Sequence, residues 1–533
     1  MTKRSLIYLL TIIVIGISVS VTSCKKDLTP KNAIITADAY KNFANYKPIL
    51  AKLYSSFALS GQQGPAGKPD ISGIDEGFSN YLREYFNMQE LTTDEAAIVW
   101  NDGTIHNLHN MNWNSQNEFI TAMYNRIFYI ISLDNEFLRQ TTDDKLASNG
   151  ITGDNLTQAK QFRAEARFLR ALTYWHAIDL FGSVPFITET DKVEVFFPKQ
   201  KSRADIFKYI ESELQAIDGD LGAPKFEYGR VDKAAAYMLL AKLYINAKVY
   251  TGTDRSSDAI KYVNKVLSAG YSLEPHFKNL FLADNNNSNE IIFPITFDGL
   301  HTQSYGGMTY LVHAPVGGKM VPADFGINGG WAGFRTTKQY VSLFTDNSGN
   351  TDKRAVFFTD GQNLEINDEY AFGDGYAIQK FRNVTSDGKV GSDPSGNFPD
   401  TDFPMFRLAD AYLIYAEAVL RGGSGGDLGT ALTYVNKVRT RAYDGSTTGN
   451  IKAADLNLNF ILDERGREFL FEMHRRTDLI RFGKFTGDSY IWAWKGGVKD
   501  GISVADNFNL MPIPSTDIVN NPTLVQNPGY SKN

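Results

Sequence analysis

The sequence predicts a mainly α-helical protein in which paired helices form a scaffold and a loop-rich region with a few short strands is inserted into it. Helical periodicity recurs over several long segments. Two of them repeat one helix–turn–helix pattern, and the stretch between these two is rich in Gly, Asn, Asp and Pro. A helical scaffold that carries an insert accounts for all three observations.

Residues 1–23 have the pattern of a secretory signal peptide. Two basic residues precede an uncharged, almost wholly apolar run over 6–21, which is shorter than the ~20 residues a membrane-spanning helix needs. The segment VTSC (21–24) resembles the lipobox of bacterial lipoproteins, whose cysteine carries a diacylglycerol and becomes the mature N-terminus. We therefore expect lipidation of Cys24 and a polar tether over 24–35; a free thiol near an ordinary cleavage site is the alternative.

Composition narrows the classes of partner. Cys24 is the only cysteine of the chain, so no internal disulfide is available to it. The formal net charge is −6, which argues against nucleic acid as a partner because nucleic acid favours a basic surface. No other apolar run is long enough to cross a bilayer, so we expect membrane contact through the lipid alone.

The N-terminal half contains three helical patterns. The first covers 36–58, and Pro48 predicts a kink or break within it, because proline lacks a backbone N–H. Residues 59–80 hold many Gly and Pro and are expected to be loop. Helices follow at 116–140 and 157–181, and the second should end at Gly182.

Two later segments share a repeat. The segments 237–266 and 412–438 both begin with Tyr, carry Ala four residues later and end in an identical YVNKV. They differ in length by three residues, in the polar loop between the helices. Helix pairs of about 34 residues with this pattern are typical of tetratricopeptide-like repeats; chance similarity of two amphipathic helix pairs is the alternative.

Six segments carry a resemblance to a known family. They are EARFLRALTYWHAIDLFGSVPF (165–186), GRVDKAAAYMLLAKLY (229–244), FRLADAYLIYAEAVLR (406–421), YVNKVRTRA (434–442), ILDERGREFLFEMHRRTDLIRFGKF (461–485) and MPIPSTDIVNNPTLVQNPGY (511–530). Their order and spacing resemble the SusD/RagB family of outer-membrane nutrient-binding lipoproteins. We therefore expect a single unit over 36–533, with its scaffold at about 36–283 and 406–533 and its insert at about 284–405.

The resemblance also implies a function. A family member captures a glycan at the cell surface and passes it to a SusC-like TonB-dependent transporter, without enzymatic activity and without a cofactor. Some members bind peptides or other nutrients instead, so that alternative stays open. A glycoside hydrolase is a further alternative, because carboxylates are plentiful, but hydrolysis requires two carboxyl groups at a set separation across one bond.

Glycan capture requires flat aromatic rings for the C–H faces of the sugars and polar side chains for their hydroxyl groups. Trp100 and Asn101 stand together at a turn, in a part of the chain that supplies ligand contacts in the resembled family. We expect Trp100 to stack on a sugar and Asn101 to bond a hydroxyl group, with Tyr81 and Arg83 as weaker candidates. The alternative is that Trp100 is a core residue that anchors a loop.

The second group of candidates lies in the insert. Trp331 stands among glycines in NGGWAGF (328–334), which would leave its ring accessible, and the resembled family places a ligand aromatic in this region. Phe334 and Tyr305 are weaker candidates.

Three other groups of residues are better explained by structural roles than by metal binding or catalysis. His106 and His109 are three residues apart, but no third ligand is specified, so no metal site is expected. The segment 284–290 resembles a calcium loop but lacks its glycine. In 463–478 we expect opposite charges to pair along a helix: Glu464, Arg465, Arg467, Glu468 and Glu472. The chain has no phosphate-binding glycine loop and no Gly-x-Ser-x-Gly motif.

Overall fold

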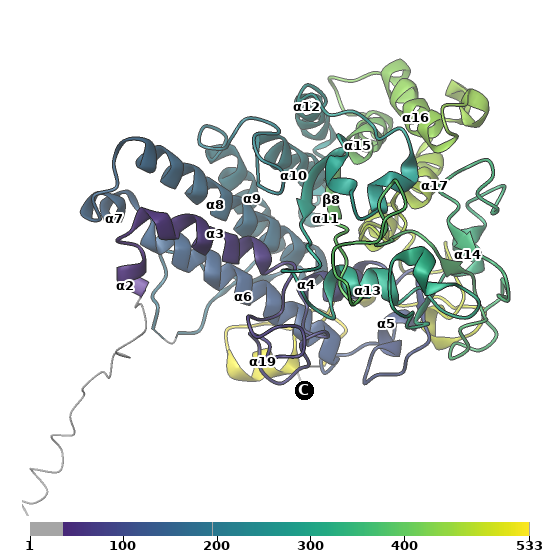
Figure 1. Cartoon of the computed structure of the whole chain (residues 1–533), viewed down its shortest axis with the longest axis horizontal. Helices are drawn as coiled ribbons and strands as arrows, with labels where there is room; N and C mark the ends of the chain where they lie inside the picture. The colour runs from purple at the N-terminus through teal and green to yellow at the C-terminus, as the bar shows by residue number, and fades with distance from the viewer. Residues whose placement is uncertain (1–35, 195, 532–533) are drawn as a thin grey trace, which may run out of the picture.

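The computed structural model describes residues 36–194 and 196–531 (Figure 1). The expected signal peptide (1–23), Cys24 and the tether that continues to residue 35 lie outside the described residues. The described chain is mainly helical, as predicted, with four two-stranded antiparallel sheets. None of its helices is both long and apolar enough to cross a bilayer.

The N-terminal helical segment differs from the prediction at Pro48. The chain forms α2 (Thr36–Ala39), a short 3-10 turn η1 (Phe43–Asn45) and α3 (Tyr46–Ser55). Pro48 therefore lies in the first turn of α3 and neither kinks nor breaks it, because the backbone N–H groups there have no partner within the helix. The break comes earlier, where the Asn42 side chain accepts a hydrogen bond from Ala44 N and caps η1.

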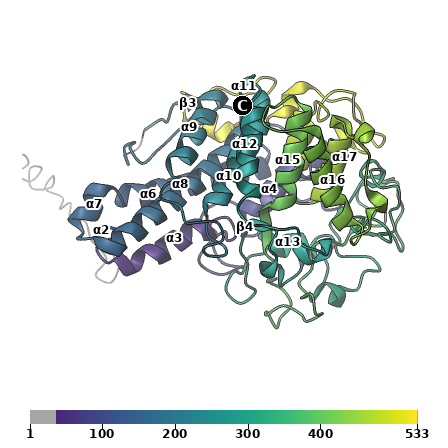
Figure 2. The ribbon, with the colours of Figure 1, turned by 90° about the horizontal axis from the view of Figure 1, so that it is seen from above.

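Long helices build one end of the molecule (Figures 1 and 2). They are α6 (Glu118–Gln140), α8 (Gly153–Phe181) and α9 (Arg203–Ala216), with the shorter α7 (Asp143–Ser148). The short helices α4 (Tyr81–Gln89) and α5 (His106–His109) lie outside this end, α4 near the centre of the molecule (Figure 1). α6 packs along α8, and α3 packs on both. α8 ends at Gly182 as predicted, because the residue takes a positive φ of 72° that favours glycine. The strands β2 (Val184–Pro185) and β3 (Gln200–Lys201) pair just beyond it.

The predicted repeat forms two helix pairs. The first comprises α10 (Lys233–Ile245) and α12 (Ser256–Leu267), joined by α11 (Ala247–Thr251), and the second comprises α15 (Leu408–Leu420) and α16 (Leu428–Ala442). Equivalent tyrosines pack in both, because Tyr237 contacts Tyr262 and Tyr412 contacts Tyr434 with ring centroids 6.1 and 4.7 Å apart. α12 also packs on α15, so the two pairs lie side by side.

The loop-rich region begins and ends on one strand pair. β4 (Ile291–Ile295) and β8 (Phe403–Arg407) are antiparallel, with Ile291 opposite Arg407. Between them lie α13 (Gly307–His313), β5 (Phe334–Arg335), α14 (Lys338–Val341), β6 (Phe357–Phe358) and β7 (Ala377–Ile378). β5 pairs outside this region with β1 (Ala97–Ile98), which follows α4. The loop-rich region is therefore tied to the N-terminal half of the chain.

The C-terminal part adds α17 (Leu458–Phe469), α18 (Arg475–Arg481) and α19 (Ser515–Asn520). Single turns of 3-10 helix are η2 (Phe277–Phe281), η3 (Asn285–Asn287), η4 (Pro322–Phe325), η5 (Thr447–Gly449), η6 (Ala453–Asp455), η7 (Lys495–Gly497) and η8 (Asp506–Asn509).

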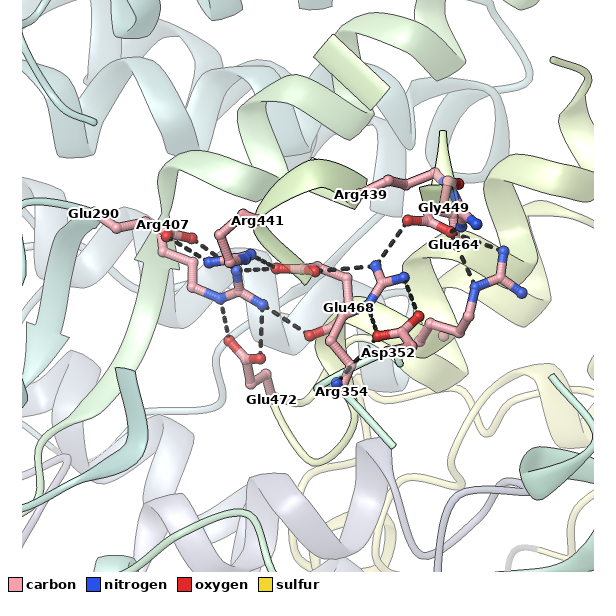
Figure 3. Close-up of polar contacts among 12 residues, drawn as sticks. Glu290, Asp352, Arg354, Arg407, Arg439, Arg441, Gly449, Glu464, Glu468 and Glu472 are labelled. Atoms are coloured by element: carbon pink, nitrogen blue, oxygen red, sulfur yellow. Dashed lines mark hydrogen bonds and ion pairs between the residues drawn. The ribbon is translucent and has the colours of Figure 1, made fainter. Parts of the chain in front are cut away.

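The charges of α17 form a buried network that joins the scaffold to the loop-rich region (Figure 3). Glu464 pairs with Arg467 along the helix at 2.8 Å, as predicted. It also pairs with Arg354 of the loop-rich region at 2.7 Å, and Glu468 pairs with Arg407 of β8 at 2.6 Å. The expectation of pairing within the helix is therefore wrong for most of these residues, because the bundle buries them against arginines from other elements.

Candidate functional site

The β1–β5 pair brings Trp100 and Trp331 together. Val99 N donates to Gly333 O at 2.9 Å and continues the ladder beyond Ile98. The next residue, Trp100, donates from its indole Nε1 to Trp331 O at 3.0 Å. The two rings are half-buried, with centroids 6.3 Å apart and planes inclined at 49°. Two residues 231 positions apart thus form one aromatic surface, which we call the tryptophan pair.

The backbone that follows Trp331 allows the ring of Trp100 to come close to it. Gly333 has no side chain where Trp100 packs, and a Cβ there would lie 2.5 Å from Trp100 Cζ2, well inside carbon–carbon contact distance. Ala332 takes a φ of 49°, an uncommon conformation for a residue with a side chain. The chain therefore turns sharply after Trp331 and leaves that ring at the surface.

His313, the last residue of α13, supports the ring of Trp331. The two rings stack with centroids 4.9 Å apart and planes 27° apart. The imidazole Nδ1 lies 2.7 Å from Gly329 O and Nε2 lies 2.9 Å from Asn397 O. Burial lowers the pKa of His313 below its usual value. Because one ring face of Trp331 rests on His313, a ligand could stack only on the other face.

Tyr305 lies just before the other end of α13. Its side chain is 38% exposed, and its ring packs on Phe398 at 5.5 Å. The residue next to Phe398, Asn397, provides the carbonyl group that faces His313. Tyr305 precedes α13 by two residues, whereas His313 ends this helix. Tyr305 therefore stays a candidate contact at the opposite end of α13 from the tryptophan pair.

Asn101 is exposed beside Trp100, and its side chain makes no hydrogen bond to the described residues. Its amide can both donate and accept, which is what a sugar hydroxyl group requires. Asn101 therefore keeps the geometry expected of a ligand contact.

Three of the weaker candidates do not reach the surface. Tyr81 and Phe334 are fully buried and Arg83 is 5% exposed. The Tyr81 hydroxyl group is 2.6 Å from His176 Nδ1, and the Arg83 guanidinium lies 4.2 Å from the ring of Tyr310. The prediction of direct contacts is therefore corrected for these residues.

Phe334 and Arg83 instead belong to a buried layer that packs on Trp100 through Tyr310. Tyr310 packs against Trp100 and Phe334, with centroids 6.1 and 5.0 Å away, and Arg83 lies on the ring of Tyr310. The sequence did not reveal the burial of Tyr81 and Arg83 because every residue of α4 is buried, its polar residues included, so polar residues do not mark an exposed face of this helix.

The two histidines of α5 do not form a metal site with neighbouring residues. His106 Nδ1 lies 3.2 Å from Glu369 Oε2, and burial lowers the pKa of His109 to about 3. Among the described residues, no group of three or more His, Cys, Asp or Glu side chains is arranged to hold a metal ion. In 284–290, Asp284 instead accepts hydrogen bonds from Ser386 N and Oγ at 2.9 and 2.6 Å.

A cleft of about 790 Å³ borders α16 and is lined by Tyr271, Tyr412 and Asn436, among others. Neither Trp100 nor Trp331 lines it, so the tryptophan pair and this cleft are separate candidate surfaces for a ligand.

Sequence reasoning missed three residues that shape this surface. His313 lies under Trp331, and the exposed Asn328 donates to Asn397 Oδ1 at 2.7 Å. Asn397 in turn presents its carbonyl group to His313. These residues come from the end of α13 and from two separate loops of the insert, so the only available signal was their polar or aromatic type near Trp331.

A helical scaffold that presents aromatic rings and amides at its surface defines a class of binding protein, and comparisons with known proteins identify its family. The model of the SusD family matches residues 351–530, and a model described as starch-binding associating with outer membrane matches residues 73–245. The chain is 36% identical to the starch-binding protein SusD of Bacteroides thetaiotaomicron, over 96% of this chain and 97% of that protein. It is 25% identical to the SusD-like protein P2 of Formosa agariphila, over 86% of this chain and 92% of the relative.

Solved structures agree with this fold. The surface glycan-binding protein A of Bacteroides thetaiotaomicron, in complex with laminarihexaose, superposes with a TM-score of 0.67 at 20% identity and covers 91% of this chain and 99% of its own. A SusD superfamily protein of Bacteroides vulgatus superposes with a TM-score of 0.70 at 20% identity, over 92% of this chain and 100% of its own. The chain belongs to the SusD family.

Proposed function

We propose that this protein binds an oligosaccharide or polysaccharide at the outer surface of a bacterial outer membrane and delivers it to a partner TonB-dependent transporter. The observation that carries the proposal is the tryptophan pair, two half-buried rings held together by the hydrogen bond from Trp100 Nε1 to Trp331 O. Membership of the SusD family supports it, because the relative at 36% identity is named as a starch-binding protein.

An α-linked glucan is the first ligand to test. The tryptophan planes are inclined at 49°, so they can follow a sugar chain that bends between successive units. An α-1,4-linked glucan bends in this way, whereas a β-1,4-linked glucan is flat and extended. The Asn101 amide and the side-chain oxygen of Asn328, whose amide nitrogen already donates to Ser395 O and Asn397 Oδ1, are our candidates to bond sugar hydroxyl groups at this surface.

We infer that the protein binds its ligand without turnover. The imidazole next to Trp331 is buried with both nitrogens facing carbonyl oxygens, which is consistent with a supporting role for His313. The relatives are named as binding proteins, which supports the same conclusion. Release of reducing sugar from any glycan by the purified protein would establish a hydrolase and refute this part of the proposal.

Affinity electrophoresis in native gels tests the ligand class. We expect gels that contain amylopectin to retard the protein more than gels with laminarin or a soluble cellulose derivative. Trp331→Ala should abolish most of the retardation, and Val321→Ala, an exposed apolar residue outside the tryptophan pair, should leave it unchanged. Retardation by no glycan, together with binding of peptides, would favour the alternative of peptide capture.

A further inference from the structure

The molecule carries a group of exposed apolar side chains that are not part of the tryptophan pair. Five side chains, here called the apolar edge, have exposed fractions between 39% and 78%: Val193, Phe196, Phe197, Val519 and Val525. Residue 195, between two of them, lies outside the described residues. Single exposed apolar residues are ordinary, but a group gathered from two segments indicates a contact surface.

Hydrogen bonds hold the two segments of the apolar edge together. Pro198 O accepts from Asn521 Nδ2 at 2.9 Å and from Thr523 Oγ1 at 2.8 Å. Gln200 exchanges two bonds with the backbone of Val525, at 3.1 and 2.8 Å. The loop that carries Phe196 and Phe197 is therefore anchored at its base on the C-terminal segment.

Positive charge flanks the apolar edge. Lys192 and Lys199 are exposed on either side of the two phenylalanines, and neither forms an ion pair within the described residues. Lys201 is exposed with its ammonium group 3.9 Å from the ring of Phe186. Glu194 is the only acidic residue in the segment 192–201, and it is exposed. Aromatic rings bordered by lysines are the composition that binds the interface of an anionic lipid layer.

The loop that leads to Phe196 and Phe197 starts at the same end of α6 as the segment that follows α2. Just after α2, Tyr40 packs on Phe137 near the end of α6, with ring centroids 6.1 Å apart. The loop toward Phe196 starts beside the same end of α6, where Arg139 Nε donates to Glu189 O at 3.2 Å.

The length of the tether limits how far this part of the molecule can be from a membrane. Residues 24–35 span at most about 40 Å when fully extended, at about 3.3–3.6 Å per residue. A lipid on Cys24 therefore keeps α2 within that distance of the bilayer, and the loop that starts at Glu189 beside the same end of α6 extends from there. Confinement of this kind raises the local concentration of lipid at the apolar edge and favours even weak insertion.

We propose that the apolar edge rests on a lipid surface with anionic headgroups, with Phe196 and Phe197 inserted to headgroup depth and the flanking lysines against the phosphates. This inference rests on the lipid anchor of the proposed function. The second contact would fix the orientation of the protein, because one flexible tether alone allows the tryptophan pair to face any direction.

Spin labelling of the lipoprotein tests the inference. Acylation blocks the thiol of Cys24, so a cysteine introduced elsewhere is the one that labels. Phe197→Cys and the control Val321→Cys carry nitroxides at positions of similar exposure, 55% and 54%. In vesicles of phosphatidylethanolamine and phosphatidylglycerol, we expect the ratio of collision rates with oxygen and with a water-soluble nickel chelate to be several-fold higher at 197 than at 321.

A second variant separates the effect of the loop from that of the label. With the nitroxide at Val193→Cys, the double substitution Phe196→Ser and Phe197→Ser should lower the ratio to that of the control position. Equal ratios at 197 and 321 would overturn the proposal. If the nitroxide at position 197 is shielded from the nickel chelate only when a transporter is present, the apolar edge contacts a protein and the proposal of a lipid contact is overturned.

The same vesicle preparation also shows whether the lipid anchor on Cys24 is present. If Cys24 itself takes the label and the protein does not sediment with vesicles, the anchor is absent and the proposed surface is refuted with it. Glycan retardation in native gels is measured separately on each variant, and it should be unchanged because the apolar edge is not part of the tryptophan pair.

Discussion

Gly333→Ala tests whether the position of Trp100 determines glycan affinity. The new methyl group would lie 2.5 Å from Trp100 Cζ2, and carbon atoms in contact are about 3.5–4.0 Å apart. The indole ring must therefore retreat by about 1 Å. The hydrogen bond from Trp100 Nε1 to Trp331 O, now 3.0 Å long, would stretch or break.

The magnitude follows from the contacts that are lost. A broken hydrogen bond costs about 0.5–1.5 kcal/mol, and a displaced stacking ring adds a similar amount to the loss of binding. We expect the free energy of glycan binding to weaken by about 1–2 kcal/mol, which raises Kd about 5- to 30-fold. The substituted residue would have no contact with the ligand itself.

Gly329→Ala is the matched control, because nothing lies within 4 Å of a Cβ at that position. Isothermal titration calorimetry with a maltooligosaccharide measures both variants, and circular dichroism verifies that each is folded. Unchanged affinity in Gly333→Ala would refute the reasoning, as would an equal loss in Gly329→Ala.

Three further predictions concern the scaffold and the anchor. Arg407→Met leaves the buried carboxylates of Glu468 and Glu472 without this partner, so chemical denaturation should show a loss of about 3–5 kcal/mol; a loss below about 1 kcal/mol would argue against a buried network. Burial raises the pKa of Glu95 to about 7, so the folded protein keeps a proton on this carboxyl group that the unfolded chain releases near pH 4.5. The bound proton stabilises the folded state fully below pH 4.5, and this contribution to the free energy of unfolding is lost as pH rises from 4.5 through 7. Glu95→Gln should therefore flatten the decline in the free energy of unfolding over this range, by up to about 1.4 kcal/mol per pH unit, and an unchanged slope would contradict the assignment. Cys24→Ala should move the protein from the membrane fraction to the soluble fraction without loss of glycan retardation, and retention in membranes would show a different anchor.

The helical scaffold was predictable because its signals are local. Periodicity and the glycine at 182 marked the end of α8, and the repeated YVNKV marked the second helix of each pair. Pro48 misled for a local reason as well, since its effect depends on its position within a helix whose start the sequence did not specify.

Exposure and long-range pairing were harder to predict. Tyr81 and Trp100 are both aromatic residues in the same part of the chain, yet the first is fully buried and the second is half-buried. The difference arises because β5, more than 200 residues later in the sequence, pairs with β1 and turns Trp100 toward Trp331. The same limit applies to Glu468, whose partner Arg407 comes from a distant strand.

The most direct test of the binding surface is a crystal structure of the protein with maltoheptaose. The account predicts successive glucose rings stacked on Trp100 and Trp331, with hydroxyl groups bonded to Asn101 and the chain extending toward Tyr305. A sugar chain bound instead in the cleft beside α16, against Tyr412 and Asn436, with the tryptophan pair uncovered, would contradict it.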